Sequence, residues 1–368
     1  MKILGVNSAI LPDANKQSQV DWWRIHRPLQ ELKKHVDWQI DEAPSFIVGL
    51  TKHMKKEEFT AEEMEKAFKV LTEYDIVFAS YHPDPTSYTM LKVAADKAGT
   101  QFVMDCDDDM FSINPDNPFW MKMTDEKVYW MQRMIADNTW ITTPSPVLAK
   151  KFAQRRGNRP KPKVIHNFIP KTYKHPPFDN GENIVIGYMG GSSHYADLHD
   201  SGALDAVAKI MHEYKNVRFK SVGMILDKYL PVQRTEFEGG KRGQAFFDDV
   251  FPSLRMDIAL GPLLDNEFNR GKSNIKWQEM TRAGAVFVGS NVGPYRTIKR
   301  GVNALLVDND ETAWYVALKQ LIENKEQRAT LLENAQKELA DNWQLEDNWE
   351  QYKTFFEEVY NAKNNKTE

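Results

Sequence analysis

Short apolar runs alternate along the chain with longer segments whose apolar residues recur every three or four positions. The runs predict buried strands, and the longer segments predict amphipathic helices. In the first half the predicted strands cover residues 2–6, 75–79, 101–104, 140–142 and 163–167, and the predicted helices cover residues 22–32, 59–71, 88–98, 128–135 and 147–154. Such alternation predicts a parallel sheet covered by helices.

The same alternation restarts after a stretch that contains Pro170, Pro176, Pro177 and an Asn-Gly pair, which is typical of a linker. Later strands are predicted at residues 184–189, 217–222, 257–260 and 286–288, and helices at residues 204–211, 275–281, 312–322, 326–339 and 349–360. We therefore predict one domain type used twice. An N-terminal domain covers residues 1–170, a C-terminal domain covers residues 171–345, and a helix with a polar tail covers residues 346–368.

Composition fits an ordinary globular protein. The chain has 368 residues, of which 41% are hydrophobic and 27% charged, enough for two domains with their own cores. A single cysteine, Cys106, excludes an intrachain disulfide and a cysteine zinc site. The net charge of -4 gives no overall attraction to nucleic acid or anionic lipid. No apolar run resembles a signal peptide or a membrane span, so we expect a cytoplasmic protein, or one of the host cytoplasm if a phage encodes it.

Residues 184–198 read IVIGYMGGSSHYADL, a predicted strand that runs into a loop before a helix. The loop consists of Gly190, Gly191, Ser192, Ser193 and His194. Glycines let a ligand approach the backbone closely, and amides at a helix start favour phosphate oxygens. The loop therefore predicts a phosphate site. The alternative is a tight turn in which Ser193 caps the helix and nothing binds.

Residues 261–284 read GPLLDNEFNRGKSNIKWQEMTRAG and lead from a predicted strand into a helix. Lys272, Lys276 and Glu279 share one face near the start of that helix. Positive charge is normally unfavourable there, so its presence suggests a bound diphosphate. Glu279 is then placed to accept hydrogen bonds from ribose hydroxyls. The alternative is a solvated face with a Lys-Glu pair. The preceding loop adds further candidates for donor binding: Asn269, Arg270, Ser273 and Asn274.

The run FNRGKSNIKWQEMTRAGAVFVGS, followed by GPY and RGVNALLVD, resembles the donor-binding half of GT-B-fold glycosyltransferases. It is most similar to the retaining group 1, or GT4-like, branch of bacterial and phage enzymes. Residues 137–145, residues 164–167 and the tryptophan-rich last helix agree with the same family. The resemblance covers nearly the whole chain and is strongest from residue 184 to residue 308. It implies an α/β fold of two Rossmann-like domains facing a cleft, with the last helix crossing back to the N-terminal domain.

The resemblance carries over residue by residue. Glu279 matches the second glutamate of the family's E-x7-E pattern, which implies ribose binding, whereas Gly271 stands where the first glutamate contacts the sugar. The backbone around Lys272, Ser273 and Asn274 is expected to meet the donor diphosphate. The family's Arg/Lys pair after the first C-domain strand is replaced by residues 191–194. We therefore expect Arg270, Lys272 or Lys276 to bring positive charge to the leaving phosphate.

An acidic cluster, which consists of Asp105, Asp107, Asp108 and Asp109, follows a predicted strand of the first half. Hard cations prefer such oxygen ligands, but GT-B enzymes generally work without a metal. We therefore expect no metal and no other cofactor. Asp105 or Asp107 is our preferred catalytic contact to an acceptor hydroxyl, and Asp108 is placed on the acceptor side. The alternative is a helix cap or a solvated loop.

Two further segments are candidates for sugar contacts. His82 follows a predicted strand, and the resemblance implies a contact with the transferred sugar; a structural histidine is the alternative. Trp22, Trp23, Arg24 and Arg27 are expected to stack on and hydrogen-bond an acceptor. The alternative is an amphipathic helix with Trp22 and Ile25 buried.

The function predicted from these features is transfer of a sugar from a UDP- or GDP-linked donor to an acceptor hydroxyl, with a surface glycan as acceptor. Residues 150–174 contain nine basic residues and no acidic one. Such a stretch fits a membrane surface or a polyanion, which leaves peripheral membrane contact open and a hydroxylated DNA base as an alternative acceptor. Because the first glutamate is missing, a non-catalytic nucleotide-sugar-binding protein is a second alternative.

Overall fold

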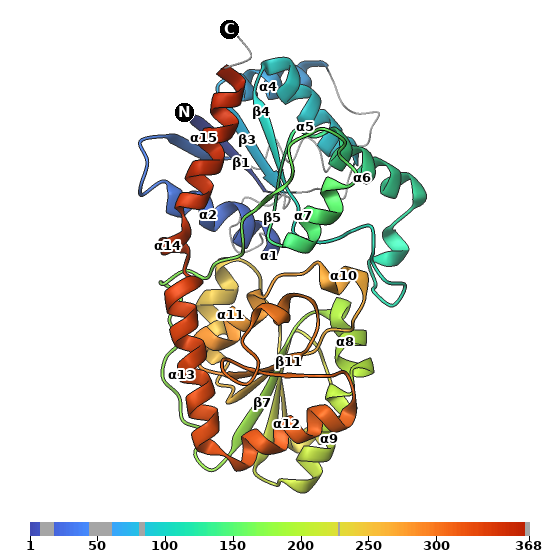
Figure 1. Cartoon of the computed structure of the whole chain (residues 1–368), viewed down its shortest axis with the longest axis vertical. Coiled ribbons are helices and arrows are strands. Elements are labelled where there is room, and N and C mark those ends of the chain that lie inside the picture. The colour runs from blue at the N-terminus through green and yellow to red at the C-terminus, as the bar shows by residue number, and fades with distance from the viewer. Residues whose placement is uncertain (8–17, 44–60, 81–84, 227–228, 365–368) are drawn as a thin grey trace. The chain divides into compact units, whose positions relative to one another are not determined.

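The computed structural model describes residues 1–7, 18–43, 61–80, 85–226 and 229–364 (Figure 1). The chain divides into two compact units. Unit 1 consists of Met1–Phe111, Met123–Asn167 and Leu345–Glu368, and unit 2 consists of Ser112–Lys122 and Phe168–Gln344. The sequence had suggested divisions after residues 170 and 345. The structure places them after residues 167 and 344, and it adds residues 112–122 to the second unit.

Unit 1 contains a parallel sheet of six strands in the order β2-β1-β3-β4-β5-β6. Its strands are β1 (Lys2–Val6), β2 (Gln39–Glu42), β3 (Ile76–Ser80), β4 (Gln101–Asp105), β5 (Trp140–Thr143) and β6 (Lys163–Val164). The register pairs Ser80 with Asp105 and Asp105 with Thr142. The carboxyl ends of these three strands therefore meet at one edge of the sheet.

The helices of unit 1 come from both ends of the chain. They are α1 (Gln19–Asp21), a π-helical turn (Trp22–His26), α2 (Arg27–Leu32), α4 (Ala61–Leu71), α5 (Pro85–Ala98), α6 (Asp125–Asp137), α7 (Pro146–Ala153), α14 (Leu345–Asn348) and α15 (Glu350–Asn364). In Figure 1, α15 (red) runs beside α2, and it also packs against β3 and β4. Phe356 of α15 packs edge-on against Phe78 of β3, with ring centroids 5.2 Å apart. The expected return of the last helix to the N-terminal unit is thus confirmed.

Unit 2 repeats this architecture with the strand order β12-β11-β10-β7-β8-β9, again parallel. Its strands are β7 (Ile184–Met189), β8 (Val217–Val222), β9 (Thr235–Glu238), β10 (Ile258–Gly261), β11 (Val286–Ser290) and β12 (Leu305–Val307). Its α-helices are α8 (Tyr195–Asp200), α9 (Ala203–Glu213), α10 (Glu267–Arg270), α11 (Ile275–Arg282), α12 (Glu311–Glu323) and α13 (Lys325–Asn342). The described residues of unit 2 also include five 3-10 turns (Trp120–Lys122, Ser192–His194, Val232–Arg234, Phe251–Ser253 and Gly293–Thr297) and a π-helical turn (Phe246–Val250).

The core of unit 2 lies where apolar periodicity had predicted it. The face of α9 formed by Leu204, Val207 and Met211 is buried, as its spacing requires. Trp314 of α12 is completely buried and belongs to the same core. The predicted α/β fold with two parallel sheets is therefore confirmed. Within the described ranges, no helix is both long enough and apolar enough to span a bilayer.

Candidate functional site

The strand order of unit 2 locates a binding region before any side chain is considered. The chain runs outward from β7 through β8 and β9, and then returns to β10 on the other side of β7. In open parallel sheets, ligands bind beyond the carboxyl ends of the strands at the point where the order reverses. The loops after β7 and β10 lie at this point, and they are the two loops that the sequence had singled out.

The loop after β7 is tightly built. A side chain on Gly190 would put its Cβ 2.4 Å from the hydroxyl of Tyr188, so any other residue there would have to displace this buried tyrosine. Gly191 precedes the 3-10 turn of Ser192, Ser193 and His194 and occupies its N-cap position. Gly191 and Ser192 are exposed, and Ser193 and His194 are partly exposed. The N-cap residue of α8 is His194, whereas the alternative interpretation had placed Ser193 there.

Asp197 of α8 links the two loops, and sequence reasoning missed it. Its side chain is buried, and Oδ2 lies 2.9 Å from Nδ1 of His194. Oδ1 accepts hydrogen bonds from the backbone N–H of Leu264 at 2.9 Å and from Nδ2 of Asn269 at 2.6 Å. An aspartate near the start of a helix is commonly a capping residue, so the sequence provides no reason to expect Asp197 to contact the second loop.

Two further residues hold the loop after β10. The backbone N–H of Leu263 donates to Oγ of Ser290 at 2.9 Å, and Nδ2 of Asn309 donates to the carbonyl of Leu263 at 2.9 Å. Oγ of Ser290 in turn donates to Oδ1 of Asn309 at 2.6 Å. Residues at or just beyond the carboxyl ends of β10, β11 and β12 are therefore joined in one network that fixes the loop.

The segment between this loop and α11 contains the predicted basic residues. Nε of Arg270 donates to Oδ1 of Asp265 at 2.7 Å, and about half of each side chain is exposed. Nζ of Lys272 lies 4.4 Å from the ring centroid of Phe268, a cation–π contact. The charge of Arg270 is thus already paired by a carboxylate, whereas Lys272 rests on an aromatic ring.

The first turns of α11 hold the remaining candidates. Asn274 occupies the N-cap position, and its Oδ1 accepts from Nε2 of Gln278 at 2.9 Å. Ser273 is partly exposed, and Glu279 is only 4% exposed. The Nζ atom of Lys276 lies 3.7 Å from Oε2 of Glu279. The first-turn amides of such a helix lack intrahelical acceptors, so this end favours an anion.

Burial and mutual repulsion lower the pKa values of Lys276 and His194 and so disfavour their charged forms. Burial lowers the pKa of Lys276; Glu279 raises it and Lys272 lowers it further. Burial also lowers the pKa of His194, Asp197 raises it, and Lys272 and Lys276 lower it. Cations that repel one another at a helix start are stabilised by an anionic ligand. The arrangement is therefore suited to a diphosphate.

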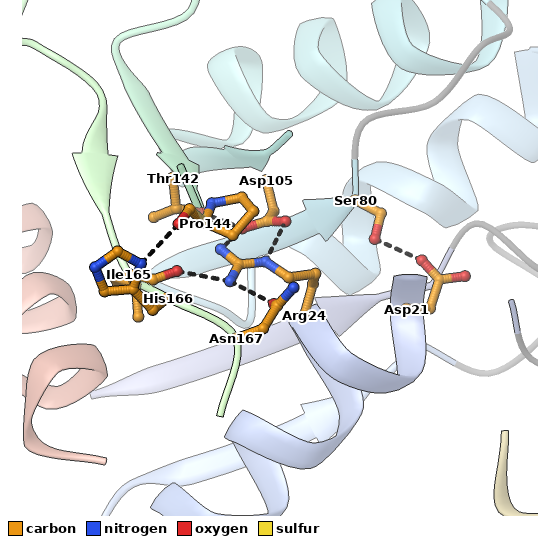
Figure 2. A network of polar contacts seen from close by, with 9 residues as sticks. All are labelled: Asp21, Arg24, Ser80, Asp105, Thr142, Pro144, Ile165, His166 and Asn167. Atoms are coloured by element: carbon orange, nitrogen blue, oxygen red, sulfur yellow. Dashed lines mark hydrogen bonds and ion pairs between the residues drawn. The ribbon is translucent and has the colours of Figure 1, made fainter. Parts of the chain in front are cut away.

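Unit 1 contains a second polar network, which Figure 2 shows. Arg24 is completely buried, and its Nε and Nη2 donate to the two carboxylate oxygens of Asp105 at 2.9 and 2.7 Å. Nη1 donates to the carbonyl of Ile165 at 2.7 Å and to Oδ1 of Asn167 at 3.0 Å. Oγ1 of Thr142 donates to Oδ2 of Asp105 at 2.5 Å. Burial opposes the charge of Arg24, but Asp105 outweighs it and raises the pKa of the guanidinium.

These contacts change the roles that we assign to Arg24 and Asp105. Asp105 is 1% exposed, and both of its oxygens are engaged within unit 1. The pair connects the π-helical turn, β4 and the last residues of unit 1 before the chain enters unit 2. We therefore assign it a structural role in place of the expected acceptor contact.

The tryptophans beside Arg24 are also buried. Trp22 is 1% exposed and Trp23 is 5% exposed, and Ile25 is completely buried. Trp22 stacks on His26 with ring centroids 4.6 Å apart, and the guanidinium of Arg27 lies 5.8 Å from the Trp22 ring. This burial favours the alternative interpretation, an amphipathic helix that packs into the unit.

The acidic cluster after β4 divides into buried and accessible members. Asp109 is 1% exposed and pairs with Lys151, whereas Asp107 and Asp108 are partly exposed. Among the described residues, no group of three or more His, Cys, Asp or Glu side chains is arranged to hold a metal ion. His82, the other predicted sugar contact of this half, lies outside the described residues.

Several solved structures have a similar fold. Anabaena Alr3699/HepE in complex with UDP and glucose is 16% identical, with 97% of this chain and 99% of that chain aligned at a TM-score of 0.68. Sucrose-phosphate synthase from Thermosynechococcus elongatus is 13% identical, with 98% and 100% aligned at 0.70. A mutant of S. aureus TarM in complex with fondaparinux, alpha-GlcNAc-glycerol and UDP is 11% identical, with 80% of this chain and 59% of that chain aligned at a TM-score of 0.59.

The sequence itself matches no protein-family model and no curated protein. At these identities the structural likeness establishes the fold and leaves the activity to be argued from the site. Two six-stranded parallel sheets with surrounding helices match the architecture of the solved structures just named. The chain therefore has the GT-B fold.

Proposed function

We propose that this protein is a glycosyltransferase that moves a sugar from a nucleoside diphosphate donor, UDP- or GDP-linked, to an acceptor hydroxyl. One observation carries the proposal. Lys272, Lys276 and His194 gather with the buried Glu279 at the switch point of a GT-B unit. Two structures of similar fold were solved with UDP bound, which supports a nucleoside diphosphate as the ligand.

In this proposal, unit 2 binds the donor. The diphosphate lies against the first turn of α11, where Lys272, Lys276 and the backbone from Ser273 to Asn274 surround it. The loop of Gly190, Gly191, Ser192 and Ser193 closes on its other side. Glu279 accepts hydrogen bonds from the ribose hydroxyls. Asn269 contributes indirectly, because its side-chain amide is engaged by Asp197 and it shapes the loop.

The chemistry needs positioning and charge. The bond between the anomeric carbon and the phosphate oxygen breaks with its electron pair on that oxygen, a bond to the acceptor oxygen forms, and the proton of the acceptor hydroxyl passes to the departing diphosphate. Lys272 and Lys276 stabilise the negative charge that develops on the departing diphosphate. We give Arg270 a smaller part than the sequence suggested, because Asp265 already pairs with it.

The acceptor is proposed to be a saccharide. TarM was solved with glycan ligands, and Asp107 and Asp108 of this chain are accessible enough to bind a hydroxyl. A DNA base is a weaker candidate, because Trp22 and Trp23, which had suggested stacking on a base, are buried. Gly271 leaves the usual sugar-binding carboxylate missing, so transfer itself has to be measured.

The test is a panel of UDP- and GDP-linked sugars, with release of the nucleoside diphosphate followed over time. We expect at least one donor to be hydrolysed slowly and to be consumed faster with a glycan acceptor. Tight binding without release would favour the non-catalytic alternative. Faster release with hydroxymethylated DNA than with any saccharide would favour the nucleic-acid acceptor. If no nucleotide sugar bound, the proposal would be wrong.

A further inference from the structure

His194 lies in the loop where the family that this chain resembles has cationic side chains. Its imidazole is held in position by Asp197. Its Nδ1 lies 2.9 Å from Oδ2 of Asp197, and 27% of its side chain is exposed. Asp197 is fixed in turn, because its Oδ1 accepts from Leu264 and Asn269. The orientation of the imidazole is therefore set by a buried carboxylate that has no freedom to turn.

This orientation determines which nitrogen of His194 carries the proton. A carboxylate can only accept hydrogen bonds, so Nδ1 of His194 must be the donor in the pair with Asp197. Nε2 then has a lone pair when the ring is neutral and a proton only when the ring is an imidazolium. His194 can thus donate a hydrogen bond to a phosphate oxygen only in its charged form.

The neighbours of His194 oppose that charged form until an anion arrives. Burial lowers the pKa of His194, and Lys272 and Lys276 lower it as well, while Asp197 raises it. Two tyrosines face Asp197, Tyr188 from β7 and Tyr295 from the turn before β12, and burial raises the pKa of both, so they remain uncharged. The unliganded site therefore favours neutral His194 near pH 7.

A diphosphate reverses this balance. Its negative charge between Lys272, Lys276 and the ring favours the imidazolium, and the ring then contributes a third cation and a directed donor. Glu279 lies beside Lys276, where it offsets part of the lysine charge. Because Lys276 then contributes less positive charge, protonation of His194 strengthens diphosphate binding more.

We propose that His194 is a proton-dependent ligand of the donor diphosphate, with Asp197 as its positioning residue. The inference rests on the proposed function. His194 takes up one proton as the nucleotide sugar binds, and Nε2 donates to a phosphate oxygen. It thereby supplies in the loop after β7 the charge that an Arg/Lys pair would otherwise bring.

The test measures affinity for UDP-glucose, or for GDP-mannose if UDP-glucose does not bind, from pH 5.5 to pH 8.5 by calorimetry in buffers of different ionisation enthalpy. A nucleotide sugar is the right probe, because its diphosphate has no terminal phosphate with a pKa of about 6. Affinity should be highest at low pH, fall by up to about tenfold per pH unit as the pH rises through the His194 transition, and then level off. About one proton should be taken up within that range.

Three variants separate His194 from its surroundings. His194→Gln should bind about tenfold or more weakly at low pH, with affinity independent of pH. Asp197→Asn keeps an acceptor for Leu264 but presents an N–H to Nδ1, so Nε2 becomes a donor in the neutral ring and proton uptake should fall. His199→Gln is the matched control, because His199 lies on α8, which directly follows His194, and its Nδ1 lies 2.9 Å from Oδ1 of Asp200. It should behave like the unmodified protein.

The outcomes are distinct. Binding by the unmodified protein with affinity independent of pH would overturn the inference and leave the proposed function standing. A pH dependence that persists in His194→Gln would assign the proton to another group, such as Lys276, and would also overturn it. Failure to bind any nucleotide sugar at any pH would contradict the proposed function itself.

Discussion

The burial of the Glu279 carboxylate carries a cost in free energy. It is 4% exposed, and Nζ of Lys276 lies 3.7 Å from its Oε2. A buried carboxylate is costly unless ion pairs and hydrogen bonds compensate for the lost hydration. Hydrogen bonds from ribose hydroxyls would add to that compensation, which would link the local chemistry of α11 to nucleotide recognition.

The first prediction concerns this carboxylate. Glu279→Gln keeps the size of the side chain but removes its charge, so it should weaken nucleotide affinity by about 10- to 100-fold, the value of one or more hydrogen bonds to a charged group. Titration calorimetry with UDP and GDP measures it. Glu333→Gln, on the exposed face of α13, is the control and should leave affinity unchanged. Equal affinities for both variants would remove Glu279 from the site.

Lys272 carries the second prediction. Lys272→Ala should lower kcat by about 10²-fold, because the charge that develops on the departing diphosphate loses a nearby cation. The melting temperature of this variant should hardly change, since the Lys272 side chain is partly exposed. Lys325→Ala, an exposed lysine at the start of α13, serves as the control. A turnover that matches the control would show that Lys272 does not face the reaction.

At the scale of elements, the ion pair of Arg24 and Asp105 connects pieces of chain that are far apart in sequence. The contact spans 81 positions, and Arg24 also reaches Ile165 and Asn167 across 141 and 143 positions. Tyr352 of α15 is close enough to interact with both charges, and burial raises its pKa to about 12. The network therefore anchors the chain where it leaves unit 1 and the helix with which it returns.

The third prediction follows from the burial of this pair. Asp105→Asn should destabilise unit 1 by about 3–5 kcal/mol, because it leaves the charge of Arg24 buried without a counterion. Urea unfolding followed by tryptophan fluorescence measures the change. Asp341→Asn breaks an exposed pair with Lys337 and should cost less than about 1 kcal/mol. A loss for Asp105→Asn as small as that of the control would contradict the structural role.

Sequence patterns predicted some elements and missed others for physical reasons. Buried central strands such as β3 and β7 were predicted because nearly all their residues are apolar. Strands β2 and β9 were missed because they lie at sheet edges and are only half buried. The predicted strand at residues 163–167 is shorter, because β6 pairs with β5 at only two positions.

The candidate site shows the same division. Lys272, Lys276 and Glu279 were recognised as candidates because their spacing in the sequence is local information. Lys272 nevertheless precedes α11, so the expectation that all three share one face of that helix is wrong for Lys272. Asp197 and Asn309 were not found, because their hydrogen bonds reach 67 and 46 positions along the chain. Burial also decides between interpretations that local pattern leaves open, as it does for Trp22 and Asp105.

For the whole molecule, stability of unit 1 and nucleotide binding by unit 2 should be separable. Phe356 of α15 is completely buried against Phe78, while the candidate donor residues all belong to unit 2. Phe356→Ala should lower the free energy of unfolding by about 3–5 kcal/mol, yet UDP affinity of the folded protein should be unchanged.

Thermal unfolding and UDP titration at a temperature where the variant is folded test this fourth prediction. The control is Glu357→Ala, in which a carboxylate that is 43% exposed is removed from the same helix. It should alter neither stability nor affinity appreciably. A matching loss of UDP affinity in Phe356→Ala would show that the two properties are coupled.

The division of the chain after Asn167 and Gln344 also dictates an order of events on the ribosome. Unit 1 lacks α15 until all residues through Gln344 have been translated. Until then, Phe78 and Trp140 lack the aromatic contacts with α15 that they make in the complete protein. Residues 168–344 can emerge and fold while unit 1 is incomplete. The amino-terminal part of the nascent chain would then be the last to mature, and during that interval it would be the part most in need of a chaperone.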